Sequence, residues 1–248
     1  MNIKKHIPNL ITLLNLFCGC IAVVYVSEAI QTNDSSNYLL AFYFVCLGIF
    51  LDFFDGFFAR LFNVSSPLGL QLDSLADMVT SGVVPGYVMY SMFANSGHEM
   101  GTNAFIPFLG FIITLGSCYR LANFNIDTRQ TDSFIGLPTP ANALFILSLP
   151  LVIKFSDSLV ILEILTNQWI LLGITLCSAY ILNAEIPLFA LKIKKFNLKD
   201  NLMQVFFLSI SIILVLLLHY TAIPLIIIFY VLLSVVNNKF FKKYFLSE

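Results

Sequence analysis

Apolar stretches of about 20 residues recur along the whole chain, and this feature limits the fold more than any other. The hydrocarbon core of a bilayer is about 30 Å thick, and a helix needs about 20 apolar residues to cross it. Of the 248 residues, 58% are hydrophobic and only 11% are charged, whereas an ordinary soluble domain is about 25% charged. We therefore expect an all-α integral membrane protein, a polytopic helix bundle.

Polar breaks divide the sequence into eight candidate helices. The fifth is short for a span and can be tilted or partly interfacial, so seven spans remain possible. No repeat or linker separates a second domain, and we expect one membrane domain over residues 1–248. The eight ranges are Leu10–Ala29, Tyr38–Phe62, Leu72–Ala94, Phe105–Asn123, Ala141–Phe155, Leu159–Leu182, Leu202–Leu218 and Ile223–Val236.

The basic residues indicate the orientation of these helices, because cytoplasmic loops collect Lys and Arg. With eight spans and a cytoplasmic N-terminus, only Lys154 of the 13 basic residues falls on the outer side. Both termini are then cytoplasmic. The cytoplasmic set is Lys4, Lys5, Arg60, Arg120, Arg129, Lys192, Lys194, Lys195, Lys199, Lys239, Lys242 and Lys243.

Charge and cysteine usage exclude several classes of function. A net charge of −1 argues against an extended nucleic-acid surface. The five cysteines lie in apolar stretches without the spacing of a zinc site or a disulfide framework, and we interpret them as packing residues. The expected partner is membrane lipid.

Four aspartates lie within 26 residues at the end of the second candidate helix and in the third. On a helix, Asp52 and Asp55 share a face at i, i+3, and Asp73 and Asp77 share one at i, i+4. A short polar loop, Asn63–Gly69, joins the two helices. If the helices are antiparallel neighbours, the acidic faces meet near the cytoplasmic surface.

Carboxylates gathered at a membrane edge repel one another and resist desolvation, and a divalent cation resolves both conflicts. All-oxygen ligation suits Mg²⁺ or Mn²⁺. One alternative is that the aspartates cap helices at the water interface, but Asp52 and Asp55 lie among phenylalanines, where an unpartnered carboxylate costs several kcal/mol. Another alternative is a cation transporter, which would place acidic groups near the bilayer midplane of repeated halves.

This segment resembles the signature of a known family. It reads Asp-x-x-Asp-Gly-x-x-Ala-Arg, then eight residues, then Gly-x-x-x-Asp-x-x-x-Asp, which is similar to the motif of the CDP-alcohol phosphatidyltransferases. The resemblance implies a membrane enzyme that displaces CMP from a CDP-linked lipid or alcohol. It further implies a homodimer, and a divalent metal centre held by Asp52, Asp55, Asp73 and Asp77, with Asp77 as a ligand or the general base.

The same resemblance implies that Gly56, Ala59, Arg60 and Gly69 shape the site for cytidine diphosphate. Glycine lets a ligand approach the backbone closely, and arginine offers a planar donor fork to phosphate. The catalytic helices would lie within about residues 1–150, with additional helices over 159–238.

A polar stripe on the first helix lies behind Pro8. Asn9, Thr12 and Asn15 share one helical face. Asn9 and Thr12 are candidates for lining the nucleotide site, and ordinary capping or interhelix hydrogen bonding is the alternative.

Two further stretches, Arg120–Asn125 and Phe134–Ala141, resemble the family members of bacterial and archaeal type whose acceptor alcohol is serine. The implied substrates are CDP-diacylglycerol and L-serine, at the cytoplasmic face of a prokaryotic inner membrane. Arg120 or Arg129 could pair with the serine carboxylate or anchor lipid phosphate, and Asn123 could add a polar contact. Inositol, inositol phosphate and glycerol 3-phosphate remain alternative acceptors, although the phosphorylated ones need more cations than this region supplies.

Overall fold

The computed structural model describes residues 6–64, 66–96, 105–127, 134–189 and 201–245, with the backbone alone for residue 134 and residues 239–245. This part of the chain is helical apart from its connections and one pair of short strands. Each of the eight predicted ranges overlaps a helix, which confirms the all-α class. In chain order the elements are α1 (Ile7–Thr32), α2 (Ser36–Phe62), α3 (Pro67–Asp77), η2 (Met78–Val83), α4 (Val84–Asn95), η3 (Ile106–Phe111), α5 (Ile112–Ile126), β1 (Phe134–Ile135), α6 (Thr139–Phe155), α7 (Leu159–Thr166), α8 (Gln168–Asn183), β2 (Pro187–Leu188), α9 (Leu202–Leu218), η4 (His219–Thr221) and α10 (Ala222–Phe245). The predicted helix Leu72–Ala94 is thus divided among α3, η2 and α4, and the number of eight spans stays a prediction.

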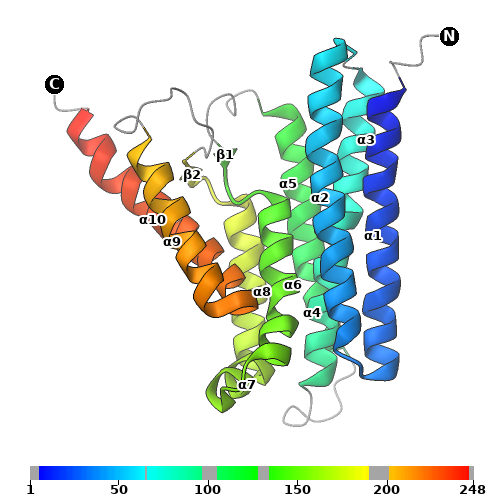
Figure 1. Ribbon diagram of the computed structural model, residues 1–248, viewed down its shortest axis with the longest axis vertical. Coiled ribbons are helices and arrows are strands. Elements are labelled where there is room, and N and C mark those ends of the chain that lie inside the picture. Colours follow the sequence, from blue (N-terminus) through cyan, green and yellow to red (C-terminus); the bar gives the residue numbers. More distant parts are fainter. Residues whose placement is uncertain (1–5, 65, 97–104, 128–133, 190–200, 246–248) are drawn as a thin grey trace.

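The helices form an elongated bundle with α1 and α2 at one flank and α9 and α10 at the other (Figure 1). The main core lies between these flanks and includes Val26, Val45, Met89, Ile113 and Ile146. A smaller apolar cluster joins the antiparallel pair β1–β2 to α9 and α10. The first turn of α1 and the last turn of α10 lie at the same end of the bundle (Figure 1).

Many large apolar side chains are exposed on the outside of the bundle, among them Phe17, Phe53 and Leu115. Four helical segments are long and apolar enough to cross a membrane: Ile7–Thr32, Ser36–Phe62, Ile106–Ile126 and Leu202–Asn238. The bent pair α7–α8 would make a fifth, and α6 is a shorter apolar helix. A surface of this kind is compatible with lipid as solvent, and the chain is a membrane protein.

The connection between α2 and α3 is shorter than predicted. Asn63 ends α2 in the left-handed conformation (φ 53°), where Asn is tolerated, and Ser66 Oγ accepts from the backbone N–H of Gly69 at 3.0 Å. This N-cap starts α3 at Pro67, so Gly69 lies in the first turn of a helix and not in the loop that the sequence predicts.

The predicted single helix Leu159–Leu182 is instead two helices that meet at Asn167. The axes of α7 and α8 are bent by 69°. Asn167 Oδ1 accepts from the backbone N–H groups of Trp169 (2.9 Å) and Ile170 (3.3 Å). The side chain thereby replaces the backbone acceptors of a continuous helix, which explains the break.

Close packing of η3 on α4 gives a stability prediction. A Cβ added at Gly110 would collide with the backbone nitrogen of Tyr90 and would lie 2.8 Å from the carbonyl carbon of Met89. We expect Gly110→Ala to destabilise the fold by about 1–3 kcal/mol, the usual range for overpacking. Thermal unfolding in detergent micelles, followed by circular dichroism, measures the change.

The matched control is Gly173→Ala on α8, where an added Cβ meets no atom within 4 Å. Alanine should leave the unfolding midpoint unchanged or raise it, since glycine costs about 1 kcal/mol inside a helix. Equal midpoints for the two variants would contradict the packing of η3 on α4.

Candidate active site

Three of the four predicted aspartates form a compact cluster. One carboxylate oxygen each from Asp52, Asp55 and Asp73 lies within 4.8 Å of the others. The first two project from α2 and the third from α3. The structure therefore brings together the acidic faces of the two helices.

Polar side chains of α1 hold this cluster from a third side. The Thr12 hydroxyl donates to the Asp55 carboxylate, and the Asn15 amide donates to Asp77 Oδ1 at 3.2 Å. Thr80, on η2, donates to Asn15 Oδ1 at 2.9 Å. Asp77 is thus fixed by Asn15 beside the three-aspartate cluster, and is not one of the three.

Small residues allow α1, α2 and η2 to approach one another at this point. A Cβ at Gly19 would lie 2.6 Å from Thr80 Oγ1, and one at Gly48 would lie 2.8 Å from Asn15 Oδ1. The turn η2 is π-helical and directly follows Asp77, and such turns are frequent at functional sites. Sequence reasoning missed Thr80, which lies three residues after Asp77 on the same helical face.

A cavity of about 180 Å³, with both polar and apolar residues in its wall, adjoins the aspartates. Asp55 and Asp73 form part of its wall, and α1, α2 and α3 all contribute. Five of the six residues predicted to bind cytidine diphosphate line it. The lining residues are Pro8, Asn9, Thr12, Asp55, Gly56, Ala59, Val64, Ser66, Gly69, Leu70 and Asp73.

Arg60 is the sixth predicted residue and is not part of this wall. Its side chain is exposed, and Nε donates to the carbonyl of Gly56 at 3.0 Å. Because Gly56 lines the cavity, the guanidinium lies next to it.

The cluster has the donor chemistry of a divalent cation site. All of its candidate ligands are carboxylate oxygens, which hard cations such as Mg²⁺ and Mn²⁺ prefer. Asp52 Oδ1 is buried and has no hydrogen-bond partner among the described residues. A buried carboxylate oxygen without a partner is costly, and a bound cation would satisfy it.

A second polar group lies where α5 packs against η2. Arg120 is buried, and its Nε and Nη2 atoms have no hydrogen-bond partner in the described part of the chain. The same holds for the hydroxyls of Ser81 on η2 and Ser117 on α5. Arg120 interacts electrostatically with Asp77, which links this group to the acidic site.

Arg129 and the two asparagines of the stretch Arg120–Asn125 are placed differently. Asn123 is exposed, while Asn125 donates to Ser74 Oγ at 2.8 Å and so connects α5 to α3. Arg129 lies outside the described residues. Ser117 was missed by sequence reasoning, although it precedes Arg120 by three residues and therefore shares its helical face.

Comparison with known proteins identifies the family. A family model for CDP-alcohol phosphatidyltransferases matches residues 5–181. This chain belongs to the CDP-alcohol phosphatidyltransferase family. The assignment confirms the resemblance drawn from the aspartate motif and replaces the transporter alternative.

Three of the relatives share one name. The chain is 37% identical over 140 residues to the CDP-diacylglycerol–serine O-phosphatidyltransferase of Bacillus subtilis, which covers 55% of this chain and 70% of the relative. It is 33% identical over 210 residues to the enzyme of that name from Helicobacter pylori strain J99, covering 82% and 80%. It is 32% identical over 153 residues to the one from Saccharomyces cerevisiae, covering 58% and 53%.

The cluster of Asp52, Asp55 and Asp73 predicts a measurable affinity for Mn²⁺. Asp52→Asn should weaken Mn²⁺ binding by at least about tenfold, because even the outer partners of a metal site are worth about 10–100-fold. Titration of the purified protein with Mn²⁺, followed by electron paramagnetic resonance, measures free and bound ion directly.

Asp34→Asn is the matched control, since Asp34 lies in the exposed connection between α1 and α2. The backbone N–H of Ser36 donates to Asp34 Oδ1 at 2.8 Å and lowers the pKa of this carboxyl. The control thus removes one negative charge elsewhere. If both variants bind Mn²⁺ as the wild type does, Asp52 is no ligand.

Proposed function

We propose that this protein transfers the phosphatidyl group of CDP-diacylglycerol to L-serine, giving phosphatidylserine and CMP. The observation that carries the proposal is the cluster of Asp52, Asp55 and Asp73 at the wall of a cavity that α1, α2 and α3 line. The names of the relatives support serine as the acceptor.

The donor would occupy the cavity beside the aspartates with its cytidine diphosphate. Asn9 and Thr12 offer polar side chains to it, and the small residues Gly56, Ala59 and Gly69 leave room for it. Arg60, next to Gly56, would contact a phosphate oxygen. The diacylglycerol would remain in the cytoplasmic leaflet.

Asp52, Asp55 and Asp73, with Asp77 as a further candidate, would hold Mg²⁺ or Mn²⁺. A bound divalent cation supplies charge neutralisation to the diphosphate and to the leaving CMP. The oxygen-only donor set and the unpartnered Asp52 Oδ1 support this assignment.

We assign the general base to Asp77. Its carboxylate is adjacent to the cluster without belonging to it, and Asn15 orients it through Oδ1. Asp77 takes the proton of the serine hydroxyl as the serine oxygen attacks the phosphorus that bears diacylglycerol. The bond from that phosphorus to the oxygen of CMP breaks, and CMP leaves.

Arg120 is the group that we assign to the serine carboxylate. A buried guanidinium with two unpartnered nitrogens is suited to a charge-assisted pair. Arg120 interacts with Asp77. A serine whose carboxylate pairs with Arg120 would therefore have its hydroxyl near the general base. Ser81 and Ser117 supply further hydroxyls at this place, Asn123 is a weaker candidate, and Arg129 stays a prediction.

We also propose eight spans with both termini in the cytoplasm, one domain and a homodimer. The start of α1 and the end of α10 lie at the same end of the bundle (Figure 1), which supports an even number of crossings. The distribution of Lys and Arg supports the orientation, and therefore an active site that faces the cytoplasm of a prokaryotic cell. The homodimer rests on the family resemblance.

Release of CMP by the purified protein tests the function. With CDP-diacylglycerol and Mg²⁺ or Mn²⁺, we expect release with serine but not with inositol, inositol phosphate or glycerol 3-phosphate. Asp77→Asn should lower kcat by about 10²–10⁴-fold, the usual worth of general base catalysis, while CDP-diacylglycerol still binds. Release with another alcohol alone would overturn the acceptor, and normal turnover of Asp77→Asn would remove it from the base role.

The acceptor site gives a separate prediction. Arg120→Lys keeps the charge but loses the planar fork, so the KM for serine should rise about 10–100-fold, as expected for hydrogen bonds to a charged group worth about 1.5–3 kcal/mol. Arg60→Lys is the comparison, because it should raise the KM for CDP-diacylglycerol instead. A serine KM that is equally affected in both variants would contradict the assignment of Arg120.

A further inference from the structure

A buried hydroxyl to which the proposed reaction gives no role lies three residues after the proposed general base. Thr80, on η2, and Asn15, on α1, are both 0% exposed. The Thr80 hydroxyl donates to Asn15 Oδ1 at 2.9 Å, and Asn15 Nδ2 donates to Asp77 Oδ1 at 3.2 Å. Two hydrogen bonds in series therefore connect Thr80 through Asn15 to the carboxylate of Asp77.

The chemistry of the carboxylate fixes the direction of both hydrogen bonds. An ionised carboxylate only accepts, so Asn15 must turn its NH₂ group towards Asp77. The amide oxygen of Asn15 then points to Thr80, which must donate. The carbonyls of Ala76 (3.1 Å) and Asn15 (3.3 Å) are also within reach of the Thr80 hydroxyl, but the amide oxygen is the nearest acceptor. Thr80 thus satisfies the end of the amide that faces away from Asp77.

Two glycines allow α1 and α2 to close around this pair of side chains. A Cβ at Gly19 would lie 2.6 Å from Thr80 Oγ1, and one at Gly48 would lie 2.8 Å from both Asn15 Oδ1 and the methyl carbon of Thr80. Such close packing leaves no room beside the hydroxyl for a water, which needs its own space and about two to four polar partners. Without the hydroxyl, the amide oxygen of Asn15 would be buried without a donor or would turn towards Asp77.

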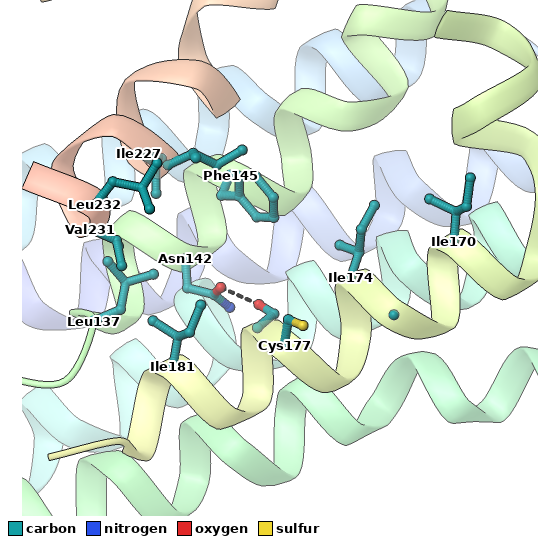
Figure 2. Close-up of a pocket in the computed structure, with 13 residues that line it drawn as sticks. Leu137, Asn142, Phe145, Ile170, Ile174, Cys177, Ile181, Ile227, Val231 and Leu232 are labelled. Atoms are coloured by element: carbon teal, nitrogen blue, oxygen red, sulfur yellow. Dashed lines mark hydrogen bonds between the residues drawn. The ribbon is translucent and has the colours of Figure 1, made fainter. Parts of the chain in front are cut away.

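Another pair of a hydroxyl and an amide in the described residues has a different setting. The Ser178 hydroxyl donates to Asn142 Oδ1 (Figure 2), and Asn142 Nδ2 has no hydrogen-bond partner in the part of the chain that the structure describes. This pair lies beside a mainly apolar cavity of about 490 Å³ between α6, α8 and α10. The amide of Asn15, in contrast, continues to a carboxylate of the candidate active site.

We propose that Thr80 is a positioning residue for the reaction: its hydroxyl fixes the amide of Asn15, which in turn holds the direction of the Asp77 carboxylate. A carboxylate that rotates freely meets the serine hydroxyl in the productive orientation less often, and a misplacement of about 1 Å can cost about 10²-fold in rate. Thr80 acts through Asn15 and needs no contact with either substrate. The inference rests on the proposed function, because it assigns Thr80 to the base of that reaction.

Thr80→Val tests the inference, because valine keeps the shape of threonine and removes only the hydroxyl. We expect kcat for CMP release to fall about 10–100-fold, as for a small misplacement of a catalytic group. The KM values for serine and CDP-diacylglycerol and the affinity for Mn²⁺ should stay at the wild-type level. Thr80→Ser keeps the hydroxyl and should keep kcat.

The matched control is Thr114→Val on α5. The Thr114 hydroxyl donates to the carbonyl of Gly82 on the same turn η2 at 2.9 Å, but it is no part of the connection to Asp77. This variant should therefore keep the wild-type kcat. An equal loss of kcat in Thr114→Val and Thr80→Val would show that any lost hydroxyl at η2 disturbs the site, and would overturn the proposal.

A double variant separates positioning of the base from general loosening of the site. If Thr80 acts only through Asp77, Thr80→Val has nothing further to remove once Asp77 is Asn, so the double variant should release CMP as slowly as Asp77→Asn alone. A further loss in the double variant, as large as the loss that Thr80→Val causes by itself, would contradict the role of Thr80 through Asp77.

A measurement without turnover distinguishes this inference from the proposed function. In protein labelled with ¹⁵N at asparagine, the NH₂ signal of Asn15, identified by its loss in Asn15→Leu, should shift in Thr80→Val and stay in place in Thr114→Val. No CMP release by the wild type with any alcohol would refute the proposed function and the role of Thr80 together. Normal release by the wild type, with an unchanged signal or an unchanged kcat in Thr80→Val, would refute the role of Thr80 alone.

Discussion

Mutual repulsion of carboxylates in a membrane protein is the constraint on which the rest of this structure depends. Asp52, Asp55 and Asp73 lie within 4.8 Å of one another, and charges this close repel strongly where water is scarce. Attraction between α2 and α3 at this point must therefore come from elsewhere. Close packing at Gly19 and Gly48 supplies part of it indirectly, because these glycines let α1 and α2 approach Asn15 and Thr80, and Thr80 lies on η2, which continues α3.

The first helix, α1, orients the side chains of the site. Thr12 and Asn15 each donate to one aspartate, so α1 holds the orientation of groups that α2 and α3 carry. Thr80 in turn donates to Asn15. Because the acidic groups project from packed helices and not from loops, their separations are set by the bundle itself, and such sites keep their geometry better than sites built on loops.

The sequence predicts the helices, the family and the cluster, because each depends on local spacing. Asp52 and Asp55 follow helical periodicity, and the apolar stretches fix where helices form. It does not predict the break at Asn167 or the start of α3 at Pro67, where one side chain replaces backbone hydrogen bonds. Nor does it reveal Thr80, Ser81 or Ser117, because a buried hydroxyl acquires its role only from the helix that packs against it.

The two cavities described above differ in character, as expected for a protein that must accommodate both a water-soluble and a lipid substrate. An enzyme that joins a water-soluble acceptor to a membrane-bound donor needs a space in which the phosphates of the donor meet polar groups of the protein. The cavity that α1, α2 and α3 line has Asp55 and Asp73 in its wall. The space between α6, α8 and α10 is lined mainly by apolar side chains instead. The α10 side of this space is held by a separate apolar cluster, in which Tyr230 packs against Leu188 and Phe207 and donates to the carbonyl of Phe189 at 2.9 Å. The position of α10 is therefore set by its contacts with β2 and α9, and not by the lining of the apolar space.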